Sequence, residues 1–128
     1  MPTIFTRIIN GEIPCHKIAE NEQFIAFLDI RPVAEGHTLV VPKKEIDYIF
    51  DHDDQTLAAM MAFAKQVARA IEKAIPCLRV GLAVIGLEVP HTHLHLIPLH
   101  QPYIDFRNTL QQSPEQLAAT ARKIVAHL

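Results

Sequence analysis

The stretch His-Thr-His-Leu-His-Leu-Ile-Pro-Leu, residues 91–99, alternates polar and apolar side chains with a period of two. Side chains of a β-strand point alternately to its two faces, so the alternation predicts a strand, within a longer one over Leu87–Pro98. His91, His93 and His95 then share one face at spacings of about 7 Å. Because every buried imidazole needs hydrogen-bond partners, a row of three indicates a functional site rather than core packing.

Two chemistries use such a row of imidazoles. A divalent metal could take two or three of them as ligands, as zinc does in enzymes with His-x-His strands. Alternatively, one neutral imidazole could attack a phosphorus atom while its neighbours donate hydrogen bonds to the phosphate oxygens. The spacing of the histidines leaves both possibilities open.

The rest of the chain predicts an α+β fold. The predicted strands are Lys17–Glu20, Phe24–Asp29, Thr38–Val41, Leu78–Ile85 and Leu87–Pro98. The order of strands, helix, strands, helix lacks regular alternation, which favours an antiparallel sheet.

Two main helices are predicted between and after these strands. The first begins at the acidic cluster Asp51–Asp54 and ends before Pro76. Its predicted apolar stripe consists of Leu57, Met60, Met61, Ala64, Val67, Ala68, Ile71 and Ile75. The second helix covers about residues 114–128, with Ser113 as N-cap, Gln116 completing a capping box, and Leu128 on its apolar face.

Composition narrows the classes of function. The 128 residues predict a single domain over 1–128, and 49% of them are hydrophobic. A net charge of −2 without a long basic run argues against a nucleic-acid polymer as partner. Two separated cysteines and no apolar stretch of membrane-spanning length predict a cytoplasmic protein without a membrane partner.

The histidine stretch resembles the defining motif of the histidine triad (HIT) family. The resemblance continues upstream in Ile4–Pro14, Phe27–Pro32 and Gly36–Lys44, and it covers about residues 3–100. It implies an antiparallel sheet of about five strands with two main helices, assembled as a homodimer. It also implies a small-molecule partner, a purine nucleoside monophosphate derivative, and no cofactor.

The resemblance further implies roles for individual residues. His93 would attack the α-phosphorus, His95 and His37 would bind phosphate oxygens, and His91 would fix the environment of the nucleophile. The base would lie against apolar side chains, and Asp29 would accept hydrogen bonds from the ribose. The proposed base-binding residues are Phe5, Ile8, Phe27 and Ile30. Core packing would explain Phe27 equally well, and Asp29 would also fit a turn cap.

This sequence departs from the family pattern in two places. Many bacterial members hold a structural zinc with two cysteines and a histidine where this chain has Thr3, Thr6 and Glu45, so no metal is expected. Where the family has a Gln and a Ser or Thr before the triad, this chain has Leu87 and Glu88. Glu88 could act on the leaving group, select a cationic one, or have no role.

The resulting hypothesis is a hydrolase or nucleotidyl transferase that acts on a phosphoramidate or dinucleoside polyphosphate. The alternative from another class is a nucleotide-binding or regulatory module with little catalysis, which the Leu87 and Glu88 departures motivate. A metalloenzyme with the triad as ligands is the third hypothesis. The histidines outside the motif, His16, His52, His100 and His127, are expected to be surface or packing residues, as is Cys15.

Overall fold

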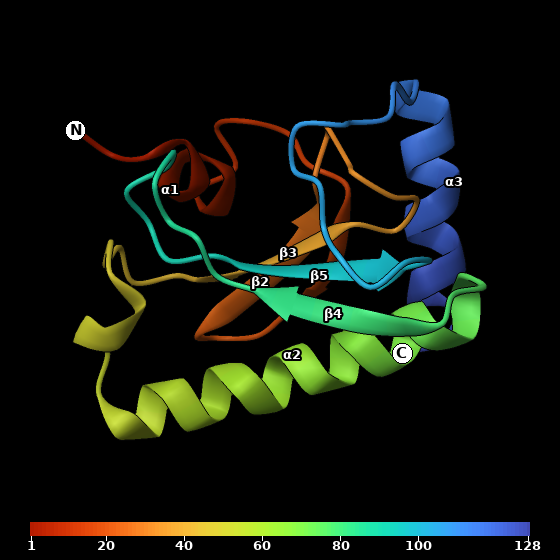
Figure 1. Cartoon of the computed structure of the whole chain (residues 1–128). Helices are drawn as coiled ribbons and strands as arrows, with labels where there is room; N and C mark the ends of the chain where they lie inside the picture. The colour runs from red at the N-terminus through yellow and green to blue at the C-terminus, as the bar shows by residue number, and fades with distance from the viewer.

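The computed structural model describes all 128 residues and has a five-stranded antiparallel sheet at its centre (Figure 1). The strands lie in the order β1-β2-β3-β5-β4. Their bounds are β1 Lys17–Glu20, β2 Phe24–Leu28, β3 Thr38–Pro42, β4 Arg79–Ala83 and β5 Leu94–Leu99. The α+β prediction is confirmed, with five strands and two main helices.

Both main helices begin where the sequence predicts. In α2, Asp54–Ala74, the side chain of Asp53 accepts a hydrogen bond from the backbone N–H of Thr56. In α3, Pro114–Val125, both hydrogen bonds of the predicted capping box are present. The expected extension of α3 to Leu128 is wrong: the helix ends at Val125, and Leu128 is 57% exposed beyond it. No helix of the structure has the length and apolar character needed to cross a membrane.

The sheet has two different apolar faces. On one face, α2 and α3 cover the larger core, which includes Phe24, Leu94 and Leu96 from the strands (Figure 1). In α2 the predicted stripe is partly wrong: Met61 is 52% exposed, whereas Phe63 is buried in the core. The buried face of α2 is therefore rotated slightly about the helix axis from the predicted one, so that it includes both Met60 and Phe63.

The opposite face carries a smaller cluster formed by Phe5, Ile25, Phe27, Leu39 and Val41. Phe5 comes from α1, Ile4–Ile9, a short helix that the sequence analysis did not predict. Its N-cap is Thr3, whose hydroxyl accepts the backbone N–H of Thr6. A helix of six residues is too short to show a repeating apolar pattern in the sequence. A helix this short is not stable on its own, so tertiary contacts hold it in place.

The predicted strand over Leu87–Pro98 is wrong in its first half, because β5 begins only at Leu94. Before that residue the backbone bonds elsewhere: the N–H of His91 donates to Val89 O and the N–H of Thr92 to Ile46 O. Pairing with β3 starts at Val40 opposite Leu94, followed by Leu39 opposite His95. Of the three histidines, only His95 therefore lies in the sheet.

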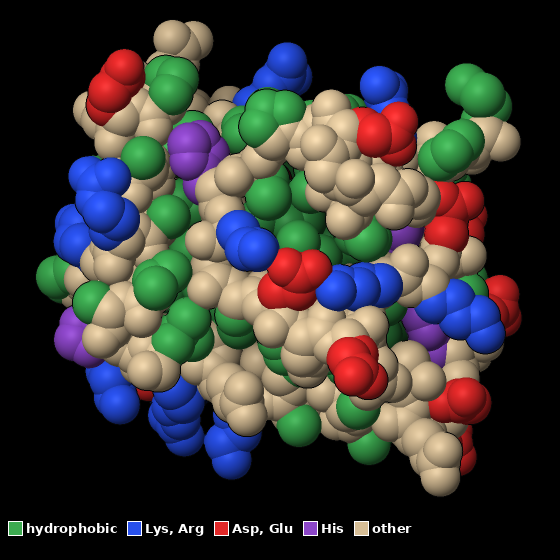
Figure 2. All heavy atoms as spheres, turned by 180° about the vertical axis from the view of Figure 1, so that it is seen from behind, with side chains coloured by type: hydrophobic (Ala, Val, Ile, Leu, Met, Phe, Trp, Pro, Cys, Tyr) green, Lys and Arg blue, Asp and Glu red, His purple; other side chains and the backbone are tan.

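Charged side chains of both signs share the surface seen in Figure 2 with apolar ones. Glu20 accepts from Lys17 at 2.9 Å and from Lys43 at 2.7 Å, so basic groups on β1 and after β3 are neutralised locally. These two lysines are therefore paired with a carboxylate rather than free to bind an anionic partner.

Candidate active site

Four histidine rings lie together on the α1 side of the sheet. The ring centroids of His93 and His95 are 5.1 Å apart, and those of His37 and His95 are 5.2 Å apart. The rings of His91 and His93 both meet the edge or face of Phe5, at 5.8 and 5.0 Å. The three rings therefore lie on one side of the sheet, as the alternation predicts, but only His95 does so from a strand.

His93 has a hydrogen bond that fixes its tautomer. Its Nδ1 lies 2.7 Å from the carbonyl oxygen of His91. Since a carbonyl can only accept, Nδ1 carries the proton and Nε2 keeps a free lone pair. The residue expected to be the nucleophile thus has its nucleophilic nitrogen available.

His37 and His95 form a chain of two neutral rings. The backbone N–H of Val33 donates to Nδ1 of His37 at 3.1 Å, so the proton of His37 is on Nε2. That Nε2–H donates to Nδ1 of His95 at 2.9 Å, which leaves the proton of His95 on its own Nε2, where it can donate to a ligand. Burial lowers the pKa of both His37 and His95 to about 4, so both rings are neutral at pH 7.

The position of His37 depends on the glycine before it. Gly36 has a φ of +92°, a conformation that side chains other than glycine rarely adopt. A Cβ there would also lie 3.0 Å from Ile75 and 3.3 Å from Pro98. This turn brings His37, which precedes β3, to the ring of His95.

Asp29 follows the last residue of β2 and lies beside these two histidines. Its Oδ1 accepts the backbone N–H of Arg31 at 2.9 Å, and its Oδ2 lies 3.7 Å from Nε2 of His37. Burial raises the pKa of the Asp29 carboxyl from its usual value, and the hydrogen bond from Arg31 opposes this rise. One oxygen therefore caps the turn, while the other is available to a ligand.

Asp29, His37 and His95 also bring three potential metal-ligand atoms within 4.8 Å of one another. The tautomers oppose this use. Because Nδ1 of His37 accepts from Val33, its Nε2 must carry a proton in the neutral ring and has no lone pair for a metal. Binding a cation there would require breaking the Val33 hydrogen bond or removing a second proton from the ring, so the set fits a metal poorly.

His91 is completely buried and is held from both sides. Its Nε2–H donates to the carbonyl oxygen of Pro42 at 2.8 Å, so its Nδ1 accepts from the hydroxyl of Thr3 at 2.7 Å. Glu45 completes the network by accepting from the N–H of Thr3 at 2.9 Å and the hydroxyl of Thr6 at 2.6 Å. The three positions discussed above for a zinc site, Thr3, Thr6 and Glu45, are thus joined to one another and to His91 by hydrogen bonds, which attach α1 to the segment that carries the triad.

Replacing Glu45 with Ala is expected to lower the melting temperature, because the N–H of Thr3 and the hydroxyl of Thr6 lose their common acceptor. Those hydrogen bonds also lower the pKa of Glu45, so their contribution is present above pH 4.5 and is lost as the pH falls below it. Thermal unfolding followed by circular dichroism measures the effect. Glu22→Ala, at an exposed turn position, serves as control, and equal melting temperatures for the two variants would contradict the role of Glu45.

The residues expected to bind the base lie on one side of the triad, but they differ in how much of each side chain is exposed to a ligand. Phe5 and Phe27 are 6% and 3% exposed and contact each other at 5.8 Å between ring centroids. They are mainly packing residues of the smaller cluster, with Ile8 packed beside them. Ile30 is 66% exposed and offers an open apolar surface.

Glu88 and Leu87 lie in the loop between β4 and β5, and both are exposed. Leu87 is 89% exposed, whereas the neighbouring Val89 packs against the smaller apolar cluster. The loop is thus attached to the face that carries the site, and Glu88 lies three residues before His91.

Near the triad, one residue was not considered in the sequence analysis, and a second was expected to have no role in the site. The ring of Phe106, from the loop after β5, lies 4.9 Å from that of His95 and 6.4 Å from that of His37. His52, which the sequence analysis assigned to the surface or to packing, is 6% exposed and bonds to Thr92. Thr92 was the signal available in the sequence: it is a polar residue on the apolar side of the histidine motif, and a buried hydroxyl needs a hydrogen-bond partner such as His52.

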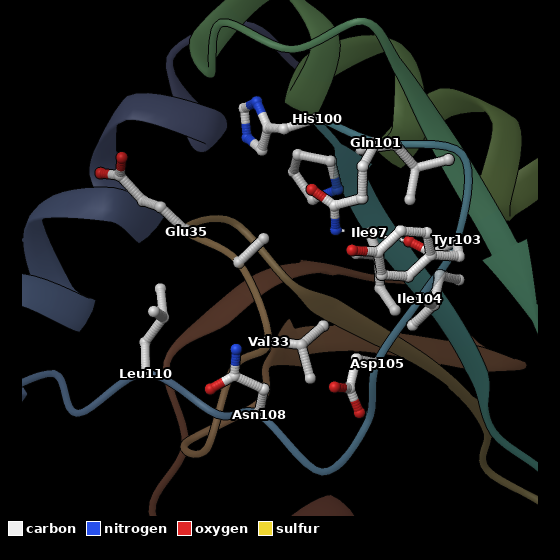
Figure 3. A pocket seen from close by; sticks show the side chains of 13 residues that line it. Val33, Glu35, Ile97, His100, Gln101, Tyr103, Ile104, Asp105, Asn108 and Leu110 are labelled. Atoms are coloured by element: carbon white, nitrogen blue, oxygen red, sulfur yellow. Dashed lines mark hydrogen bonds between the residues drawn. The ribbon is translucent and has the colours of Figure 1, made fainter.

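The loop that carries Phe106 also encloses a cavity of about 240 Å³. Figure 3 shows Tyr103, Ile104 and Asp105 of this loop around the cavity together with Val33 and Ile97. Ile97 follows His95 by two residues on β5, so the cavity continues the line of the histidines. None of the four site histidines lines it.

Comparison with known proteins gives a consistent result. The sequence matches the model of the HIT domain family over residues 10–102. It is 41% identical to the adenosine 5'-monophosphoramidase of Saccharomyces cerevisiae, over 74% of this chain and 61% of that protein. The corresponding enzyme of Schizosaccharomyces pombe is 36% identical, over 77% of this chain and 74% of that one. A HIT-like protein from Bartonella henselae, described as involved in cell-cycle regulation, superposes with a TM-score of 0.87 at 33% identity and covers 98% of this chain and 96% of its own.

Proposed function

This chain belongs to the HIT family, and on that premise we propose that it is a hydrolase or nucleotidyl transferase acting on the α-phosphate of a purine nucleotide derivative. The substrate class is a nucleoside phosphoramidate or a dinucleoside polyphosphate. The two yeast relatives, which are named adenosine 5'-monophosphoramidases, support nucleotide hydrolase activity and favour the phosphoramidate and an adenine base.

The observation that carries the proposal is the tautomer of His93. Its Nδ1–H is held by the carbonyl of His91 at 2.7 Å, so Nε2 can attack the α-phosphorus. A bond forms between Nε2 and phosphorus, and the bond to the amine or phosphate leaving group breaks with its electron pair going to that group. The leaving group takes up a proton from solvent. Water then attacks phosphorus, the bond to Nε2 breaks with its electron pair returning to that nitrogen, and the proton that water loses goes to solvent, which releases the nucleoside monophosphate and regenerates His93.

Neutral donors around His93 would bind the phosphate. The Nε2–H of His95 can donate to a phosphate oxygen, and His37 orients it through their 2.9 Å hydrogen bond. The free oxygen of Asp29 suits the ribose hydroxyls. The exposed side chain of Ile30 suits the base, and the cluster that contains Phe5, Ile8 and Phe27 would supply apolar packing on the same side of the triad. His91 would act on His93 through its carbonyl and through the network that holds it in place.

The test is turnover of adenosine 5'-monophosphoramidate by the purified protein, with the guanosine compound and a dinucleoside polyphosphate in the same panel. Release of the nucleoside monophosphate, together with a protein mass increased by one nucleoside monophosphate after rapid acid quenching, is the expected result. Calorimetry with AMP measures binding separately. Micromolar AMP binding without turnover of any compound would instead favour the nucleotide-binding module that Leu87 and Glu88 motivate.

We also propose that the protein assembles as a homodimer through the β4 edge of the sheet. β4 pairs only with β5, so its other side offers unpaired backbone groups. Exposed apolar side chains lie on and beside it: Leu82 is 44% exposed, Leu78 76% and Ile85 55%. A second copy that pairs its own β4 would satisfy these groups and bury these side chains.

Replacing Leu82 with Glu is expected to shift the protein from dimer to monomer, because two carboxylates would face each other across the new interface. Light scattering after size exclusion, at several protein concentrations, measures the mass. Val125→Glu is a matched control, since Val125 is also 44% exposed but lies on α3. A wild-type protein that is monomeric at all concentrations would exclude this assembly.

Cys15 and Cys77 are both free thiols, partly buried. Burial raises the pKa of each thiol, which keeps them in the less reactive protonated form. Unpaired cysteines fit a reducing compartment, which supports the proposal of a cytoplasmic location.

A further inference from the structure

Thr92 lies between His91 and His93 in the sequence, but its side chain makes contacts that the two histidines do not share. It is 1% exposed, and its hydroxyl donates to the carbonyl oxygen of Ile46 at 2.7 Å. The same carbonyl accepts the backbone N–H of Thr92, also at 2.7 Å. The hydroxyl and the backbone N–H of this residue are thus both bound to the segment between β3 and α2.

His52 provides a third bond to the same residue. Its Nε2 lies 2.9 Å from Oγ1 of Thr92. Because the single hydrogen of the hydroxyl is used on Ile46, Thr92 must accept here, and Nε2 of His52 must carry the proton. The result is a directed chain in which His52 donates to Thr92 and Thr92 donates to Ile46.

The position of His52 is itself well fixed. It follows the 3₁₀-helix Ile49–Asp51, and its backbone N–H bonds back to the carbonyl of Ile49. The next residue, Asp53, is the N-cap of α2. The start of the longest helix is therefore connected through one imidazole to the centre of the histidine motif.

This connection bears on the nucleophile. The carbonyl of His91, which belongs to the peptide bond joining His91 to Thr92, accepts the Nδ1–H of His93. Three hydrogen bonds hold Thr92, and so they set the direction of that carbonyl and with it the ring of His93. We propose that His52 is a positioning residue which, through Thr92, holds the His91 carbonyl that orients His93 for the reaction; this rests on the proposed function.

Thr92→Val tests the proposal because it keeps the side-chain shape and removes the hydroxyl. We expect kcat to fall about tenfold to a hundredfold, with KM changed less than about threefold, since a small misplacement of a reacting group can cost this much. His52→Phe should have a similar effect. The kcat of the double variant should be no lower than that of the less active single variant, because both changes break the same chain of hydrogen bonds. His52→Gln, whose amide can still donate to Thr92, should recover part of the lost kcat.

The Nδ1 proton of His93 gives a readout that does not depend on turnover. In the wild-type protein its short hydrogen bond should give a low-field, slowly exchanging proton resonance. In Thr92→Val and His52→Phe this resonance should shift and exchange faster. Thr120→Val is the matched control: Thr120, on α3, is 2% exposed, and its hydroxyl bonds to the side chain of Glu35 in the loop between β2 and β3 rather than to residues 91–95.

The outcomes separate a positioning role from a structural one. If Thr92→Val lowers the melting temperature as Thr120→Val does but leaves kcat and the His93 resonance unchanged, the proposal is wrong. If the wild-type protein turns over no substrate, the proposed function fails, and the His93 resonance alone decides whether His52 and Thr92 orient the ring. A changed resonance supports the inference in that case, and an unchanged one overturns it.

Discussion

His93→Ala is expected to lower turnover of adenosine 5'-monophosphoramidate by about 10⁴-fold or more, the scale of loss seen when a covalent nucleophile is removed. The reason is that no other ring of the site combines a bound Nδ1–H with a free Nε2: His37 and His95 both carry their proton on Nε2. AMP binding should change less than about tenfold, because the ring of His93 is only one of several groups around the phosphate.

The measurement combines steady-state turnover, calorimetry with AMP and mass analysis of acid-quenched protein. The nucleotidyl adduct should be present in the wild-type protein and absent from the variant. His127→Ala, at an exposed position after α3, removes a histidine without touching the site and should behave as wild type. Turnover by His93→Ala within about tenfold of wild type would exclude His93 as the nucleophile.

Stability is expected to fall steeply between about pH 6.5 and pH 4. Burial lowers the pKa of His37 and of His95 to about 4 in the folded protein, whereas each titrates near 6.5 in the unfolded chain. In that range the unfolded chain binds more protons, so protons favour unfolding; above 6.5 the stabilisation is complete, and it is lost as the pH falls towards 4. For one histidine a shift of this size corresponds to about 3 kcal/mol, a large fraction of a typical domain's stability.

Urea unfolding at closely spaced pH values tests this expectation. His91 and His52, whose pKa values burial also lowers, should add to the slope in the same direction. Asp29 opposes it at the acid end, because burial raises the pKa of its carboxyl. His37→Asn removes one titrating ring and should flatten the curve. A wild-type free energy of unfolding that is constant from pH 7 to pH 4.5 would contradict the burial of neutral rings.

A structural element could be predicted where the residues that determine it are neighbours in the sequence. The capping box at Ser113 and Gln116 and the alternation around His95 are encoded by neighbouring residues, and both were predicted. The start of β5 was placed too early because the backbone N–H groups of His91 and Thr92 bond to Val89 and Ile46 rather than to a neighbouring strand, which the alternation pattern cannot reveal. Leu128 was assigned to the apolar face of α3, but the helix ends before it.

The site was predictable where the histidine motif carries it and was missed where distant segments contribute. His52 is forty residues from Thr92, and nothing near it in sequence distinguishes it from a surface histidine. Phe106 lies in a loop without a repeating pattern, and only the folded chain places it on His95. Similarly, Thr3, Thr6 and Glu45 were recognised as departures from a metal site, but their hydrogen bonds with one another and with His91 required the structure.

The hydrogen bonds among Thr3, Thr6, Glu45 and His91 affect how the protein withstands oxidants. Thiolates bound to zinc are open to attack by peroxide and other oxidants, which release the metal and loosen whatever it holds. Here α1 is attached by two hydroxyls, one carboxylate and one imidazole. None of these groups is readily oxidised, so the position of Phe5 against His93 should persist under oxidative stress.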